Sequence, residues 1–232
     1  SMLIWNKDWE NWTVAMSPLR PEPDENPKSL RAMYLPRPGH ADLVGVLKYD
    51  RRDTRDILER ASARETAARV ACAAVVRRLL GEFGIEVGSH VCSIGDVEAP
   101  PPQALPDDLN RTADASPVRT LSEKAGVRMM EAIDQAKEEG DTLGGVFEVV
   151  VTGLPVGLGS HVSWDCKLDA RLAGAVMSIQ AIKGVEIGLG FEGARRRGSG
   201  VHDPIVLHES ASRSGGFLRS SNGAGGLEGG VT

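Results

Sequence analysis

Residues 63–82 are the segment that most constrains the fold, because they predict a long helix with small or apolar residues around most of its circumference. The small side chains of Ala67, Ala71 and Ala74 allow other elements to pack closely on several sides of this helix. A helix without a broad polar face is expected inside a domain rather than on its surface. The sequence therefore predicts that this helix is central.

The remaining chain predicts a mixture of helices, strands and irregular stretches, which is an α+β fold. An amphipathic helix is predicted over residues 122–139, with Val127, Met130 and Ile133 on one face and Gly140 as its stop. A further helix fits residues 168–183. Strands are predicted over residues 2–5, 85–95, 145–153 and from Val185 onward, and proline-rich irregular segments over 17–38 and 99–117. The tail over residues 210–232 is rich in glycine and serine, a composition typical of a linker without fixed order.

The pattern G-[IV]-E-[VI]-G occurs at residues 84–88 and again at 184–188, each time after an alanine-containing helix. Gly84 would cap the preceding helix, and the alternating apolar residues would enter a sheet. The repeat suggests a duplicated helix-strand unit. Chance matching in a chain rich in alanine, glycine and valine is the alternative.

Composition and charge exclude several classes of function. With 232 residues and 41% hydrophobic content, the chain can bury a sizeable core. A net charge of -5 and the lack of a basic stripe with interleaved aromatic residues argue against nucleic-acid binding. No stretch has the apolar length of a membrane span. Cys72, Cys92 and Cys166 are widely spaced and odd in number, so the sequence predicts neither a disulfide framework nor a zinc site, and it favours a reducing cytoplasm.

Residues 59–66, ERASARET, are the best candidate for an anion site. Ser62 and Glu65 have the spacing of a capping box at the start of the predicted long helix. Arg60 and Arg64 flank the same helix end, where free N–H groups and the helix dipole favour a phosphate. An ordinary cap with two solvated arginines is the alternative interpretation.

His40 is the best candidate for moving a proton. It lies in RPGHAD, after a Pro-Gly turn and close to Arg37 and Asp42, where a loop histidine is accessible. A lone loop histidine is more often simply solvated. His90 lies within a predicted strand and is expected to be packed. The chain contains no nucleophile elbow, Walker loop or dinucleotide-binding glycine pattern.

Six segments, taken in order, resemble successive motifs of the chorismate synthase family. They are RPGHADLVGVLKY at 37–49, ERASARETAARVA at 59–71, GDTLGGVFE at 140–148, GLPVGLG at 153–159, AVMSIQAIKGVEIGLGF at 175–191 and SSNGAGGLEGG at 220–230. The resemblance implies a β-α-β sandwich with long central helices between antiparallel sheets, assembled as a homotetramer. It also implies a carbon-oxygen lyase that converts 5-enolpyruvylshikimate 3-phosphate to chorismate by 1,4-elimination of phosphate. The cofactor would be reduced FMN, with NADPH as a reductant, and the product would feed aromatic amino acid biosynthesis.

The resemblance also assigns roles to individual residues. His40 matches a catalytic histidine thought to manage the protonation state of the reduced flavin. Arg37 and Arg64 would hold the phosphate and carboxylates of the substrate, and no residue is assigned to a metal. The FMN contacts would be Arg60, Ala61, Ser62, Gln180, Ala181 and Gly229.

The chain also departs from the family pattern. Family members begin with a GESHG-like motif that carries another catalytic histidine, and they continue into a KPTS-like flavin loop. Neither motif is found in residues 1–232, and Leu189 stands where the family commonly has Asp. These departures predict a truncated single-domain core with little activity alone. The alternative is a non-catalytic remnant that weakly binds FMN or phosphorylated ligands.

Overall fold

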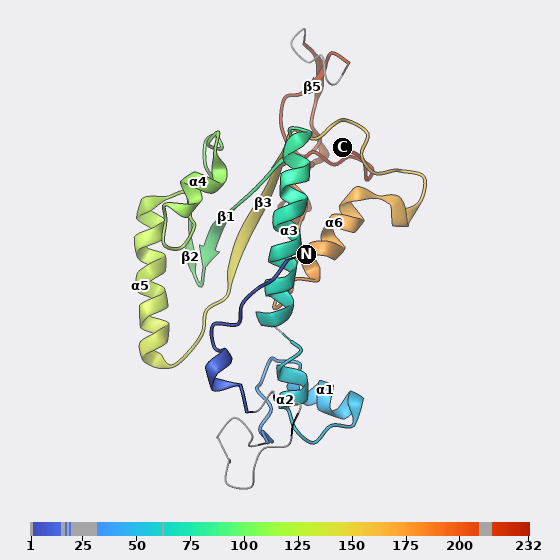
Figure 1. Ribbon diagram of the computed structural model, residues 1–232. Coiled ribbons are helices and arrows are strands. Elements are labelled where there is room, and N and C mark those ends of the chain that lie inside the picture. Colours follow the sequence, from blue (N-terminus) through green and yellow to red (C-terminus); the bar gives the residue numbers. More distant parts are fainter. Residues whose placement is uncertain (1, 15–16, 18, 20–31, 62, 209–214) are drawn as a thin grey trace. The chain divides into compact units, whose positions relative to one another are not determined.

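The described part of the chain divides into two units. The computed structural model describes residues 2–14, 17, 19, 32–61, 63–208 and 215–232 (Figure 1). The first unit comprises Ser1–Val75 and Ala175–Gly184, and the second comprises Val76–Gly174 and Val185–Thr232. Two helices, α3 (Ala63–Glu82) and α6 (Leu168–Met177), run from one unit into the other.

An antiparallel sheet with strand order β2-β1-β3 organises the second unit. β1 (Glu86–Ile94) pairs with β3 (Gly145–Thr152), with Glu86 opposite Thr152 and Ile94 opposite Gly145. The short β2 (Val97–Glu98) folds back on the end of β1. β3 is rich in β-branched residues, which favour the pleated backbone.

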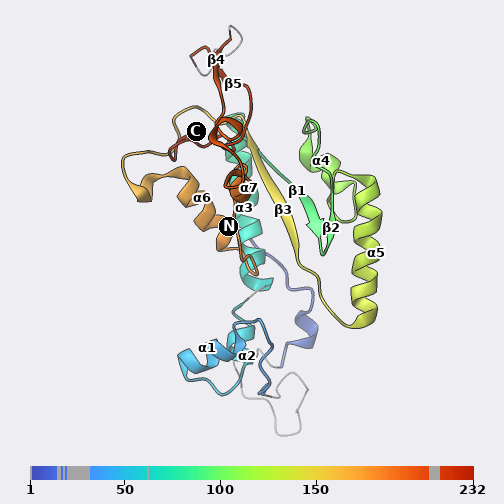
Figure 2. The same ribbon diagram turned by 180° about the vertical axis from the view of Figure 1, so that it is seen from behind.

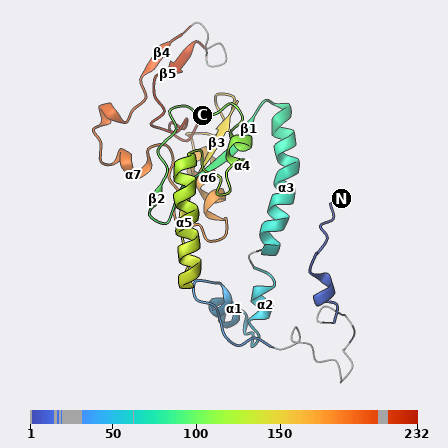
Figure 3. The same ribbon diagram turned by 90° about the vertical axis from the view of Figure 1, so that its left-hand side faces the viewer.

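Two helices cover β1 and β2 of this sheet, α4 (Leu109–Asp114) and α5 (Glu123–Glu139), as Figure 3 shows. The Ser122 hydroxyl caps α5 by accepting from the Ala125 N–H, and Gly140 ends it with a φ of 73°. Val97, Ala125 and Met129 form the buried core between helix and sheet. The core is small and lies at one end of the β1–β3 ribbon.

The rest of the second unit consists of short elements (Figure 2). They are η3 (Trp164–Cys166), α7 (Gly190–Gly193), η4 (Gly198–Gly200), β4 (Ile205–Leu207) and β5 (Phe217–Arg219). β4 and β5 pair antiparallel. The Asp203 carboxylate holds the turn over residues 221–224, which follows β5. It accepts hydrogen bonds from the N–H groups of Gly223 and Ala224 and from the Ser221 hydroxyl.

The first unit is built from short helices and the beginning of α3. Its other elements are η1 (Trp9–Asn11), α1 (Asp42–Tyr49) and α2 (Arg55–Leu58). α1 packs on α2 where Gly45 meets Ile57. A Cβ at position 45 would lie 2.6 Å from Ile57 Cγ2, so glycine is required for this close approach.

The structure confirms the α+β class, the antiparallel sheets and most of the long elements. α3 begins and ends within one residue of the prediction, and α5, β1 and β3 also agree with their predicted ranges. Gly84 has a φ of 71°, as expected of the glycine that ends a helix.

Four predictions about secondary structure were wrong. Residues 2–5 form no strand, the segment 99–117 contains α4, and the helix from Leu168 ends at Met177 instead of residue 183. No strand begins at Val185 either. The Leu189 N–H donates to the Gly223 carbonyl, and Gly188 has a φ of 59°, so this segment packs on a turn rather than entering a sheet. The second copy of the repeat therefore lacks the strand that a duplication requires.

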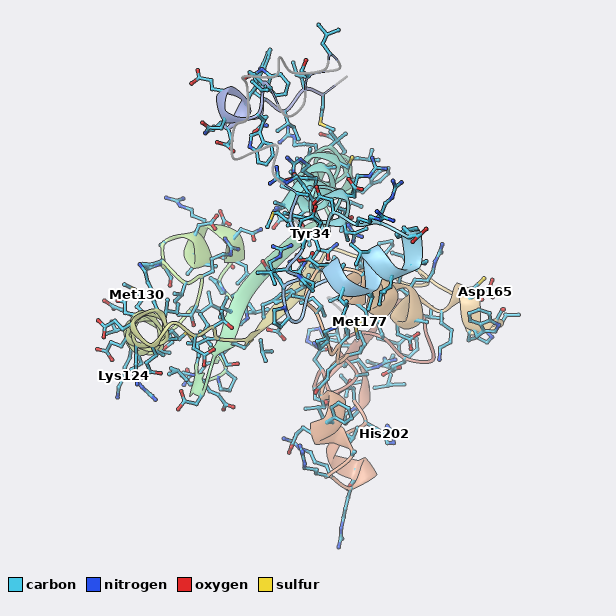
Figure 4. All side chains as sticks on the ribbon, turned by 90° about the horizontal axis from the view of Figure 1, so that it is seen from below. Tyr34, Lys124, Met130, Asp165, Met177 and His202 are labelled. Atoms are coloured by element: carbon cyan, nitrogen blue, oxygen red, sulfur yellow. The ribbon has the colours of Figure 1, made fainter. Side chains whose placement is uncertain are left out.

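The predicted apolar face of α5 meets the sheet only in part, because Ile133 lines a cavity with Val91 and Phe147 whereas Val127 is 55% exposed. Val127, Met130 and Ile133 all keep substantial exposure, and Figure 4 labels Met130 on α5. Ala125 and Met129 are the buried residues, since they lie on one stripe of the helix at a spacing of four, and Ile133 continues that stripe. α3 has no buried residue in the described structure, so its predicted central position is not reached within this chain.

No helix in the described ranges has both the length and the apolar character needed to cross a membrane.

Candidate functional site

The His40 loop is shaped by a tight turn ahead of α1. Pro38 and Gly39 occupy its central positions, and Gly39 has a φ of 70°, which is the combination typical of a type II turn. The turn reverses the chain between Arg37 and His40. Asp42 follows in the first turn of α1, so the three charged or polar side chains come from six consecutive residues.

A buried carboxylate fixes the loop. Asp42 is only 2% exposed and accepts from Arg37 Nε at 2.8 Å, Arg37 Nη2 at 3.1 Å and the Arg37 backbone N–H at 3.1 Å. These hydrogen bonds from Arg37 lower the pKa of Asp42 from 3.8 to about 2 and outweigh the opposing effect of burial. The same contact raises the pKa of Arg37. Sequence reasoning placed Asp42 beside His40 but missed that it anchors Arg37.

His40 lies against this ion pair. Its Nδ1 is 3.2 Å from Arg37 Nη2 and 3.6 Å from Asp42 Oδ1. A guanidinium has no acceptor, so the contact with Arg37 requires Nδ1 to accept and assigns the proton to Nε2. The side chain is 31% exposed. His40 is thus oriented by Arg37 and retains access to solvent, as a group that exchanges protons with a ligand requires.

The residues predicted to form an anion site lie at and just before the start of α3. Ser62 lies outside the described residues, so its predicted cap is not tested. Arg64 forms an ion pair with Glu59, whereas Arg60 has no ion pair with another described side chain. Glu65, the other member of the predicted capping box, forms an ion pair with Arg69 one turn later.

Gln180 is brought to the same helix by two contacts within the first unit. Hydrogen bonds from Arg69 and then from Gln180 lower the pKa of Glu65. One turn further along α3, Arg69 Nη1 donates to Ser178 Oγ at 2.7 Å. Residues more than 100 positions apart in the sequence therefore meet at the beginning of α3.

Ala181 has an unusual backbone conformation, with a φ of 68°. A residue with a Cβ in the left-handed region is strained, and such strain is often found at binding sites. Gly229, the last predicted cofactor contact, belongs to the second unit and has a φ of 64°. Its neighbour Gly230 accepts from the Leu168 N–H.

Within the first unit, the structure joins several of the predicted residues into two groups. Arg37 and His40 form one group, anchored by Asp42. The segment with Arg60, Ala61 and Arg64 leads into α3, which Gln180 contacts through Glu65. Gly229 lies in the other unit.

Comparison with known proteins identifies the family. The sequence profile described as chorismate synthase matches residues 1–232. The chain belongs to the chorismate synthase family. It is 56% identical over 234 residues to the chorismate synthase of Symbiobacterium thermophilum and 50% identical over 233 residues to that of Bacillus subtilis. Both alignments cover 100% of this chain and 59% of the relative.

A solved structure agrees with this assignment. A crystal structure of a chorismate synthase is 51% identical, with a TM-score of 0.75, over 83% of this chain and 59% of the other chain. The family resemblance predicted from the six motifs is thus confirmed. The chain spans about three fifths of the length of the chorismate synthases that it matches.

Proposed function

We propose that this chain contributes the His40 loop and part of the flavin site to a chorismate synthase. The reaction is the 1,4-elimination of phosphate from 5-enolpyruvylshikimate 3-phosphate, which gives chorismate for aromatic amino acid biosynthesis. The arrangement of Arg37, His40 and Asp42 is the observation that carries the proposal. It places a guanidinium and an oriented imidazole together on one loop, within a chain of the family.

In this proposal Asp42 positions Arg37, and Arg37 positions His40. Arg37 keeps Nε2 as the protonated nitrogen of His40, so that Nε2 is the atom at which a proton is held or transferred. Arg37 and Arg64 would bind the phosphate and carboxylates of the substrate. Because Arg64 already pairs with Glu59, a bound anion must compete with that carboxylate.

The residues near the start of α3 suit a phosphorylated flavin. The first N–H groups of α3 have no partners within the helix, and Arg60 has no ion pair with another described side chain. The strained backbone of Ala181 is a further sign of a binding surface. Arg60, Ala61, Ser62, Gln180, Ala181 and Gly229 would hold FMN. Reduced FMN supplies electron density that assists departure of phosphate, and NADPH is the proposed reductant.

The proposal extends to assembly and location. We expect a cytoplasmic homotetramer for the full-length enzyme. Several large apolar side chains of α3 are more than half exposed, and exposed apolar surface of this kind is typical of an interface. They are Val70, Val75, Val76 and Leu79.

The test replaces His40 in the full-length enzyme and measures chorismate formation anaerobically with reduced FMN. We expect His40→Ala to lower kcat by about 100-fold, because a positioned acid-base group contributes on this order. FMN affinity, followed by flavin fluorescence, should change little. His161→Ala, at an exposed histidine, is the matched control. An unchanged kcat in His40→Ala would refute the proposed role.

The 232-residue chain by itself is expected to bind FMN with little turnover. The same anaerobic assay distinguishes this expectation from the alternative of a non-catalytic remnant. If both the 232-residue chain and the full-length enzyme bind FMN but form no chorismate, the result supports a non-catalytic remnant and refutes the catalytic proposal.

A further inference from the structure

Three side chains that can bind metals meet on the β1–β3 ribbon, in the second unit. His90 and Glu148 are directly opposite each other in the antiparallel pairing, and His90 Nε2 is 2.9 Å from Glu148 Oε2. Cys92 Sγ is 3.9 Å from His90 Nδ1. One ligand atom from each residue can be chosen so that all three lie within 4.8 Å of one another.

A β-bulge contributes to this arrangement. Val91 is opposite Phe147 and Ser93 is opposite Val146, so Cys92 is an extra residue without a partner in the register of the two strands. Bulges redirect side chains and occur frequently beside functional sites. Here the bulge occurs at the cysteine whose sulfur is next to the imidazole.

The chemistry of the three groups is that of a transition-metal site. We propose that His90, Cys92 and Glu148 bind one divalent cation of the zinc class, with a further coordination position open to water or a ligand. Thiolate, imidazole and carboxylate are the protein ligands of Zn²⁺, at bond lengths of about 2.0–2.3 Å. Tetrahedral coordination at those bond lengths sets the ligand atoms about 3.5 Å apart. Side-chain rotations that move the ligand atoms by about 1 Å would therefore complete the site.

The charges of the three groups also suit a cation. Burial and then the nearby Glu148 carboxylate raise the pKa of the Cys92 thiol, so binding must displace the thiol proton, and a bound cation would offset the repulsion between the thiolate and the carboxylate. His90 is 4% exposed, which limits its rotation, whereas the Glu148 side chain is 55% exposed and free to adjust. One thiolate and one carboxylate together balance the charge of a divalent ion.

Titration of the untagged chain with Co²⁺ tests the site, because Co²⁺ reports its ligands by absorption. We expect one equivalent to bind, with a sulfur-to-cobalt charge-transfer band in the near ultraviolet. Zn²⁺ should displace the signal, and Mg²⁺ should not, since sulfur and nitrogen donors favour softer ions. Cys92→Ser should remove the band and weaken binding more than about 100-fold, because even the loss of an outer-shell partner costs 10–100-fold. Cys166→Ser, at an exposed cysteine, is the matched control and should bind as the unaltered chain does.

A second variant keeps the test independent of folding. Glu148→Gln preserves the size of an exposed side chain and should weaken Co²⁺ binding at least about 10-fold, with an unchanged circular dichroism spectrum. Bound Zn²⁺ should also protect Cys92 from alkylation, and it should leave Cys72 and Cys166 reactive. Mass spectrometry of the digested chain identifies which cysteines are alkylated. Failure of the unaltered chain to bind stoichiometric Co²⁺ would overturn the proposal, and so would a charge-transfer band that persists in Cys92→Ser.

Discussion

Replacement of Asp42 by asparagine should destabilise the first unit by about 1–2 kcal/mol at neutral pH. The pKa of Asp42 is lowered from 3.8 to about 2, and each pKa unit corresponds to about 1.4 kcal/mol of stability. The full shift would give a little over 2 kcal/mol. The partner Arg37 is 45% exposed at its side chain, and solvent screening reduces the value to the range given.

The effect should depend on pH in a defined direction. Because the folded state lowers the pKa of Asp42, its stabilising contribution is complete above the ordinary value near 4. It is lost as the pH falls from about 4 toward 2, when the carboxylate of the folded chain becomes protonated. The difference in unfolding free energy between the two chains should therefore fall to about half its neutral value near pH 3.

Urea unfolding followed by tryptophan fluorescence measures this difference. Three of the four tryptophans, Trp5, Trp9 and Trp12, belong to the first unit, so a Trp164→Phe background makes the signal specific to that unit. Asp56→Asn is the control, because its carboxylate is 52% exposed and 3.9 Å from Arg51, and it should cost less than about 0.5 kcal/mol. Equal losses for the two variants, or a loss at Asp42 that does not change with pH, would refute the reasoning.

Two further predictions concern packing and a turn. Gly45→Ala should destabilise the first unit by about 1–3 kcal/mol, because the added Cβ would lie 2.6 Å from an Ile57 methyl group. Gly81→Ala should instead stabilise α3 by up to about 1 kcal/mol, because the space around Gly81 is open and alanine favours a helix. Thermal unfolding of both variants checks this contrast, and equal effects would contradict it. Asp203→Asn should speed hydrogen exchange of the Gly223 amide about 10-fold at constant pH, because the carboxylate accepts from that N–H at 2.6 Å. Unchanged exchange by mass spectrometry or NMR would show that other contacts hold the turn.

Local elements were predictable because their determinants are neighbours in the sequence. The Gly140 stop of α5 depends only on backbone dihedrals and on hydrogen bonds within a few residues. The Pro-Gly turn before His40 is of the same kind. The failed prediction at Val185 shows the limit. Its alternating apolar residues permit a strand, but contacts with residues 223–225 hold it in another conformation.

The candidate site was only partly predictable for the same reason. The sequence identified Arg37, His40 and Arg60 as charged groups in loops or at a helix start. It could not show that Asp42 would be buried against Arg37 or that Gln180 would reach Glu65, since both contacts depend on how segments pack. Burial of a carboxylate cannot be deduced from its neighbours in the sequence.

The sequence by itself determined the family, the long helices with the glycines that end them, and the identity of the charged residues near His40. Tertiary structure decided which of these groups meet. The cluster of His90, Cys92 and Glu148 is the plainest case, because Glu148 is 58 positions from His90 and the spacing of the cysteines predicted no metal site. Strand register and one bulge bring these side chains together. Register is fixed by which face of the sheet is buried, and that choice is made by the packing of the whole unit.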